Sequence, residues 1–432
     1  MPSRPDSSTL TSTPRETLYR AKSVVTMDGP VIENGAVRVQ GSKIAAVGPY
    51  AEVRRDGGET VDLGEVALLP GLVNTHCHLD FTVLRGRIAP QASFADWIRQ
   101  INRHRASLSE HDYRDSIARG FEEAGSFGTT TIANIESVPA LLAAIDPPPL
   151  RTWWFIELID VRSDVGGKEL IEKSLAHCCG KEHWPGGFGL SPHALYTVSP
   201  ALLRLAGEVA HEHKMPLTMH VAESREEMEM FRDGRGELFD LLQSLGRPMD
   251  DCCRGKTPFA LLLESDLLDE SWILVHLNEL AETDFVSLER APRFHIAHCP
   301  RSGRHFGHTA FPLRRLQELG YNICLGTDSL ASNGSLSLFA EMQALSNAHP
   351  WLAPKQILEM ATVNGARALG QSTNLGKIRS GLQADLIAVP IGEQSREVFE
   401  TIMACDRPVP WSMVGGRSVD RVRSVAPVFS QS

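Results

Sequence analysis

The sequence predicts an α/β fold, a (β/α)8 TIM-like barrel with a small β-sandwich domain built from both termini. Three observations favour this fold. Eight apolar, strand-like runs alternate with segments of helical period. Metal-binding residue types follow several of these runs, and short strands with turn signals lie at both ends of the chain. A chain of 432 residues is long enough for one large core and a smaller second domain.

The two ends of the chain share a short-stranded pattern. Residues 37–39 and 43–47 flank the turn Gly41-Ser42 and predict a hairpin. The pattern returns at 381–389 and around 412–425. We therefore expect one composite β-sandwich domain from residues 16–66 and 376–432, enclosing a barrel domain of residues 67–375. Residues 1–15, rich in Ser, Thr and Pro, are expected to be a disordered arm.

The barrel region is expected to follow a regular strand–helix order. The predicted strands are residues 66–73, 129–135, 152–159, 188–190, 217–221, 272–275, 293–297 and 322–325. Clear helical period occurs in residues 112–124, 200–213, 311–319 and 336–345.

Four of these strands end in residues suited to a metal site. His76 and His78, spaced i and i+2, point the same way at the exit of the first strand. His220, His276 and Asp328 end three later runs. Since the carboxyl ends of barrel strands meet at one face, these side chains should converge there. Three imidazoles and one carboxylate (His76, His78, His220, Asp328) suit one divalent ion, Zn²⁺ most of all or Fe²⁺, with a position open to water.

Glu223 lies three residues beyond His220 and is expected to move protons rather than bind the metal. It could protonate a substrate ring nitrogen while hydroxide adds to the neighbouring carbon, and His276 and Asp328 could pass the hydroxide proton to the leaving group. The alternative for Glu223 is an acidic residue at the start of the helix that follows. We therefore predict Glu223, His276 and Asp328 as catalytic residues.

Composition and net charge limit the classes of binding partner that we expect for this protein. The net charge of -10, without a Lys/Arg cluster, argues against nucleic acid. The eight cysteines include no Cys-x-x-Cys, which indicates a reducing compartment. No signal peptide is evident, and no run approaches the ~18 apolar residues of a membrane span. We expect a soluble cytoplasmic protein that binds a small heterocyclic substrate.

Five motifs carry a resemblance to a known family: Pro-Gly-Leu-Val-Asn-Thr-His-Cys-His at 70–78, Ser-Pro-His-Ala-Leu-Tyr-Thr-Val-Ser at 191–199, His-Val-Ala-Glu at 220–223, His-Cys-Pro-Arg-Ser at 298–302 and Gly-Thr-Asp-Ser at 326–329. This set resembles the amidohydrolase superfamily, in its mononuclear aminohydrolase branch. That branch contains cytosine, guanine, S-adenosylhomocysteine, methylthioadenosine and aminodeoxyfutalosine deaminases, and related chlorohydrolases.

The resemblance implies the same metal ligands, with Glu223 as proton shuttle and His276 as second catalytic group. It further implies His193 as a substrate contact, and Trp97, in Phe94-Ala95-Asp96-Trp97, as another candidate. A homo-oligomer would be usual. The fourth strand end lacks the lysine of the binuclear branch, which favours one metal.

Two segments depart from the branch. Its adenosine-type enzymes tend to carry a carboxylate soon after Phe-x-x-Trp that binds the ribose hydroxyls, whereas residues 98–106 here are basic and the next acid is Glu110. These basic residues could face a substrate carboxylate, as aminodeoxyfutalosine would offer, or form a solvated helix face. Gly303 replaces the asparagine of a Cys-Pro-x-Ser-Asn signature, and the loop 304–308 could line the pocket or serve structure alone.

The predicted function is a metal-dependent hydrolytic deaminase of nucleoside metabolism. It would release ammonia from an amino-substituted purine nucleoside or related heterocycle by attack of metal-bound hydroxide. An alternative is a chlorohydrolase that dehalogenates a triazine-like ring with the same nucleophile. A non-catalytic barrel scaffold is a third alternative, although such proteins usually lose metal ligands.

Overall fold

The computed structural model describes residues 16–161, 166–252, 254–392 and 397–419. The expected arm at 1–15 and the end of the expected C-terminal strands, 420–432, lie outside the described residues. No helix in the described ranges has the length and apolar character needed to cross a bilayer.

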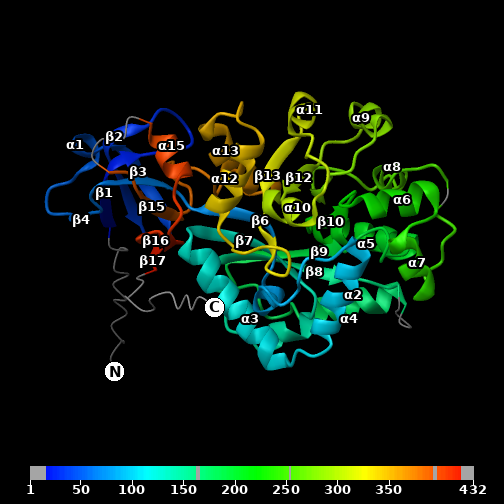
Figure 1. Cartoon of the computed structure of the whole chain (residues 1–432). Helices are drawn as coiled ribbons and strands as arrows, with labels where there is room; N and C mark the ends of the chain where they lie inside the picture. The colour runs from blue at the N-terminus through cyan, green and yellow to red at the C-terminus, as the bar shows by residue number, and fades with distance from the viewer. Residues whose placement is uncertain (1–15, 162–165, 253, 393–396, 420–432) are drawn as a thin grey trace, which may run out of the picture.

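The larger unit is a ring of parallel strands (Figure 1). Its members in order are β6 (Leu72–His78), β7 (Thr129–Glu136), β8 (Arg151–Leu158), β9 (Gly186–Pro192), β10 (Leu217–Val221), β11 (Trp272–His276), β12 (His295–His298), β13 (Asn322–Leu325) and β14 (Asp328–Ser329). β13 pairs with β12, and β14 pairs with β6. Because β13 and β14 are consecutive pieces of one segment, the sheet closes on itself, and the (β/α)8 prediction is confirmed.

Two backbone hydrogen bonds hold the closing segment between its neighbours. Gly326 N–H donates to His298 O and Thr327 N–H to His76 O, both at 3.0 Å. The eighth strand therefore spans 322–329, and its last part places Asp328 beside β6. The sequence had predicted only its first half as strand.

Helices follow the strands around the ring. They are α2 (Phe94–Arg105), α3 (Glu110–Ser126), α4 (Gly167–Ala176), α5 (Pro200–His213), α6 (Arg225–Asp233), α7 (Glu237–Ser244), α8 (Pro258–Leu263), α9 (Glu282–Leu288), α10 (Pro300–Phe306), α11 (Leu313–Glu318), α12 (Leu338–Ala348), α13 (Pro354–Met360), α14 (Val363–Ala368) and α15 (Val398–Met403). Local capping explains the best predicted starts: Ser109 forms a capping box with Asp112 at α3, and Ser199 caps α5 ahead of Pro200.

A second, mixed sheet combines both termini. It contains β1 (Glu16–Val24), β2 (Ile32–Gln40), β3 (Lys43–Pro49), β4 (Glu59–Asp62), β5 (Val66–Pro70), β15 (Leu386–Pro390), β16 (Trp411–Val414) and β17 (Arg417–Ser418), and the short helix α1 (Tyr50–Val53) lies beside it. β5 pairs with β1 on one side and β15 on the other. The expected hairpin is present as β2–β3, and the expected pairing of the two ends is confirmed. The division into domains at 66/67 stays a prediction, and that boundary falls inside β5.

One difference concerns the first predicted barrel strand. Residues 66–73 are two strands in two sheets, β5 and β6, and the chain changes sheet at Gly71. Gly71 N–H donates to Asp385 O, whereas Leu72 N–H donates to Gly128 O. A Cβ at Gly71 would overlap the side chain of Thr130. Only glycine fits this crossing point, because it brings no side chain.

Candidate active site

Three histidines meet at the carboxyl ends of the ring's strands. The ligand atoms of His76, His78 and His220 lie within 4.8 Å of one another. The His76 ring lies edge-on to both partners, at centroid distances of 5.0 Å from His78 and 4.9 Å from His220. All three are buried, His76 and His78 at the end of β6 and His220 near the end of β10.

Asp328 presents one carboxylate oxygen to these histidines. Its Oδ1 lies 3.7 Å from His76 Nε2 and 3.8 Å from His78 Nε2. Its Oδ2 accepts a hydrogen bond from Ser302 Oγ at 2.5 Å, and the N–H of Ser329 donates to Oδ1 at 2.7 Å. The carboxylate is thus fixed in orientation by groups that do not belong to the histidine cluster.

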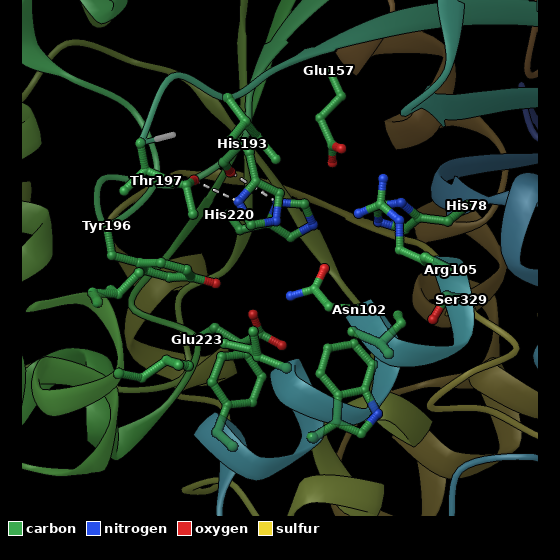
Figure 2. A pocket seen from close by; sticks show the side chains of 18 of the residues that line it. His78, Asn102, Arg105, Glu157, His193, Tyr196, Thr197, His220, Glu223 and Ser329 are labelled. Carbon is green, nitrogen blue, oxygen red and sulfur yellow. Dashed lines mark hydrogen bonds between the residues drawn. The ribbon is translucent and has the colours of Figure 1, made fainter. Parts of the chain in front are cut away.

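His193 orients His220. The carbonyl oxygen of His193 accepts hydrogen bonds from both the backbone N–H and Nδ1 of His220, each at 2.9 Å. Since a carbonyl only accepts, Nδ1 carries the proton and Nε2 keeps a free lone pair. The His193 ring in turn lies 2.7 Å, Nδ1 to Oγ1, from Thr197 (Figure 2).

The donor set fits a divalent cation. Both ring nitrogens of His76 and Nδ1 of His78 are buried and have no hydrogen-bond partner among the described residues. Such orphaned nitrogens are costly unless a ligand satisfies them. Burial lowers the pKa of His78 and of His220, which keeps the imidazoles neutral as metal ligation requires. Burial raises the pKa of Asp328, but the nearby imidazoles of His76, His276 and His78 outweigh burial and hold the pKa of Asp328 well below its usual range.

Glu223 and His276 lie together beside this cluster. Glu223 Oε1 is 3.5 Å from His276 Nε2 and 3.9 Å from His308 Nε2. Burial raises the pKa of Glu223 to about 8, so its carboxyl group holds a proton at neutral pH. The backbone of Glu223 is held by the Glu227 side chain, which accepts a hydrogen bond from Glu223 N–H, and by Asn278, whose Nδ2 donates to Glu223 O at 3.1 Å.

The strand ends that carry these groups have an unusual backbone. Ala222, His276, Leu277 and Asp328 all have positive φ, between 50° and 77°. Non-glycine residues adopt this region at a cost of ~1–3 kcal/mol each, and such residues cluster at functional sites. The surrounding hydrogen bonds therefore maintain a conformation that the chain would not adopt alone.

A single pocket connects the predicted site residues (Figure 2). His78, His220, Glu223, His276 and Asp328 line it, while His76 is fully buried below. The two predicted substrate contacts, His193 and Trp97, also line the pocket. The Trp97 ring stacks on Phe94 and meets Phe306 edge-on, so α2 packs against the end of α10.

The basic segment on α2 divides into an exposed part and a pocket part. Arg99 pairs with Asp96 at 2.6 Å, and Arg103 donates to Gln100 at 3.1 Å, both on the exposed surface. These contacts match the solvated-face interpretation. Arg105, at the end of the same helix, instead lines the pocket.

Sequence reasoning missed Glu157 and the contact of Ser302, and it left the roles of Arg105 and His308 open. Glu157 follows the pattern that identified the histidines, because it lies near the end of a predicted strand. Ser302 belongs to a motif that was recognised, but nothing in the sequence pairs it with Asp328. The predicted loop 304–308 is partly helical, since residues 304–306 end α10, and His308 follows its C-cap Gly307. The Nε2 atom of His308 is buried without a hydrogen-bond partner in the described ranges.

Two models of protein families match parts of this chain. The model of the amidohydrolase family matches residues 67–419, and that of an imidazolonepropionase-like composite domain of bacteria matches residues 35–56. A 5-methylthioadenosine/S-adenosylhomocysteine deaminase of Syntrophobacter fumaroxidans is 33% identical over 379 residues, which cover 84% of this chain and 81% of the relative.

Two solved structures share the whole architecture. An adenosine deaminase from Xanthomonas campestris with bound zinc superposes with a TM-score of 0.82 at 25% identity, covering 94% of this chain and 93% of the other. A Helicobacter pylori aminofutalosine deaminase in complex with methylthio-coformycin has a TM-score of 0.81 at 22% identity, covering 93% and 100%. The second likeness concerns the fold.

Proposed function

The chain belongs to the amidohydrolase family, and on that premise we propose that it hydrolytically deaminates a purine nucleoside or closely related compound, releasing ammonia. The observation that carries the proposal is the meeting of three histidines and Asp328 with a protonated Glu223 in one pocket. The deaminase relative at 33% identity supports the substrate class.

We assign the metal ligands as His76, His78, His220 and Asp328, with zinc as the ion. The buried, unpaired nitrogens of His76 and His78 support this assignment, as does the zinc in the adenosine deaminase structure. When bound, the ion supplies Lewis-acid activation of a water molecule. Metal analysis of the purified chain tests its identity, with about one zinc per chain expected.

Protein groups then move the protons. Glu223 donates its carboxyl proton to the ring nitrogen next to the attacked carbon, as its raised pKa permits. Asp328 Oδ1 and His276 Nε2 accept one proton of the attacking water and pass it to the departing amino group, and the second water proton returns to the Glu223 carboxylate. Water and the amino compound become the oxo compound and ammonia. His193 and Trp97 contact the substrate from the pocket wall.

The remaining assignments extend the same proposal. In this proposal residues 67–375 are the catalytic barrel domain, and residues 16–66 and 376–432 are assigned to the small β domain. A small-molecule substrate and a cytoplasmic location fit the relative's activity on soluble metabolites.

Ammonia release from a panel of amino-substituted rings tests the function. The panel contains cytosine, guanine, adenosine, methylthioadenosine, S-adenosylhomocysteine and aminodeoxyfutalosine, with chelator-treated protein as control. Chelator-sensitive release from a purine nucleoside is expected. Release of chloride from a chlorinated triazine, with no ammonia from the panel, would favour the chlorohydrolase alternative instead.

A further inference from the structure

The pocket has a second polar end, formed by residues that the chemistry above does not use. Arg105 comes from the last turn of α2 and Glu157 from the end of β8, and both side chains point into the pocket (Figure 2). Within the described ranges, no group donates a hydrogen bond to the Glu157 carboxylate. Glu157 is half-buried and lines the pocket, so a ligand bound there can supply the hydrogen-bond donors that the protein does not.

The positive charge of Arg105 is already balanced by groups of the protein. Its guanidinium lies over the Phe81 ring, 5.1 Å from the centroid. Burial lowers the pKa of Arg105, but the carboxylates of Glu157 and Asp80 act against burial and raise it overall. Asp80 is fully buried, and its Oδ2 accepts a hydrogen bond from Ser137. One arginine therefore interacts with two carboxylates, that of Glu157 on the pocket wall and that of the fully buried Asp80.

This charge balance disfavours an anion at the arginine. A substrate carboxylate beside Arg105 would approach Glu157 and Asp80 in a poorly hydrated space, where like charges repel strongly. The neighbouring Arg99 and Arg103 cannot assist, since both turn to the exposed face of α2. This end of the pocket is built to accept hydrogen bonds from a neutral group.

We propose that Glu157 binds the vicinal hydroxyl groups of the substrate's sugar, with Arg105 as the residue that positions the Glu157 carboxylate. The inference rests on the proposed function, because a purine nucleoside places its sugar away from the carbon under attack. The two oxygens of one carboxylate suit two adjacent hydroxyl donors. In this chain the acidic residue that binds the two hydroxyl groups then comes from β8. The segment after Trp97 has no acidic residue before Glu110 and does not need one for this purpose.

Paired substrates test this assignment in the full-length, zinc-loaded protein. Glu157→Gln keeps the size of the side chain and removes its charge. We expect it to lower kcat/KM for adenosine by about 10²-fold and to leave kcat/KM for 2′,3′-dideoxyadenosine within about threefold. Arg105→Gln should raise KM for adenosine with little change in kcat, because it loosens Glu157 and touches no reacting atom. Glu110→Gln, at the first acidic residue after Trp97, is the matched control and should leave kcat/KM unchanged for both substrates.

Binding of inosine and 2′,3′-dideoxyinosine by calorimetry gives a readout without turnover. Wild-type protein should bind inosine more tightly, and Glu157→Gln should remove that preference. If Glu157→Gln lowers the affinity for both ligands equally, the proposal is wrong. It is also wrong if the wild-type protein binds a 3′-amino-3′-deoxy analogue more tightly than inosine, since that would indicate a site for an ammonium group. If adenosine releases no ammonia while inosine binding shows the expected preference, the deaminase proposal fails and the diol site stands.

Discussion

The Glu227 side chain holds the backbone of Glu223. Its Oε2 accepts a hydrogen bond from the N–H of Glu223 at 2.7 Å, and its Oε1 accepts one from Ala222 at 3.1 Å. Ser224 caps the first turn of α6 by accepting a hydrogen bond from the N–H of Glu227, so residues 222–224 and Glu227 form one hydrogen-bonded unit. The unit fixes Ala222 in its left-handed conformation and directs the Glu223 side chain into the pocket.

Glu227→Gln should therefore lower kcat about tenfold without changing zinc content. A glutamine offers one acceptor oxygen where two N–H donors need one each, so the Glu223 backbone loses a hydrogen bond. Steady-state kinetics and metal analysis check the expectation, with Glu212→Gln on the exposed face of α5 as control. Loss of zinc in proportion to activity would show that Glu227 supports the metal site instead.

Glu223→Gln should leave zinc near one per chain and lower kcat by ~10²-fold or more. The amide cannot donate the proton that the ring nitrogen requires, whereas the histidine cluster is untouched. Zinc content and kcat measured on the same preparation decide the outcome. If zinc is lost together with activity, Glu223 is a ligand or a support of the metal site.

Ser302→Ala should weaken zinc binding ~10–100-fold with a smaller effect on kcat at saturating zinc. The substitution removes the hydrogen bond that fixes Asp328 Oδ2, and groups of this kind tune metal affinity through the ligand they orient. Competition with a chromophoric chelator measures the affinity. Ser287→Ala, on α9, is the control, and equal affinities for the two variants would refute the role given to Ser302.

Stability should depend on pH through Glu341. Burial raises its pKa to about 8, although the N–H of Arg301 and the Asn333 side chain donate hydrogen bonds to it. The folded state thus holds a proton that the unfolded chain releases above about 4.5. The stabilisation is complete below that pH and is lost as pH rises through about 8, at no more than about 1.4 kcal/mol per pH unit.

Urea unfolding of wild type and Glu341→Gln across pH 5–8 isolates this contribution. The difference in unfolding free energy, wild type minus variant, should decrease as pH rises, because the glutamine cannot ionise. A difference that is constant with pH would mean that Glu341 is ionised in the folded protein.

The sequence predicted the convergence of the histidines and Asp328 because strand position alone determines it. In a parallel ring, a residue at a strand's carboxyl end reaches the same face as its counterparts, whichever strand carries it. The partners of these residues depend on side-chain reach across the fold. Ser302 meets Asp328, and Glu227 meets the backbone of Glu223, through geometry that no spacing rule contains.

The break at Gly71 was not predictable for a different reason. An apolar run looks the same whether it stays in one sheet or passes between two, and only the nearby Thr130 excludes a side chain there. The sequence could not assign the arginines of α2 to the pocket or to the solvent, because helical period does not tell which face of the helix packs against the barrel. Arg99 and Arg103 lie outside, and Arg105 lies in the pocket.

The pairing of β5 with β15 has a consequence for the order of folding. Leu69 pairs with Ile387 across more than three hundred residues, so the mixed sheet cannot be completed until nearly the whole chain has left the ribosome. The edge of β5 that awaits β15 stays open during that time, and open edges invite pairing with other chains. Synthesis of this protein should therefore be most vulnerable to aggregation late, after the barrel strands have emerged and before residues 386–390 arrive.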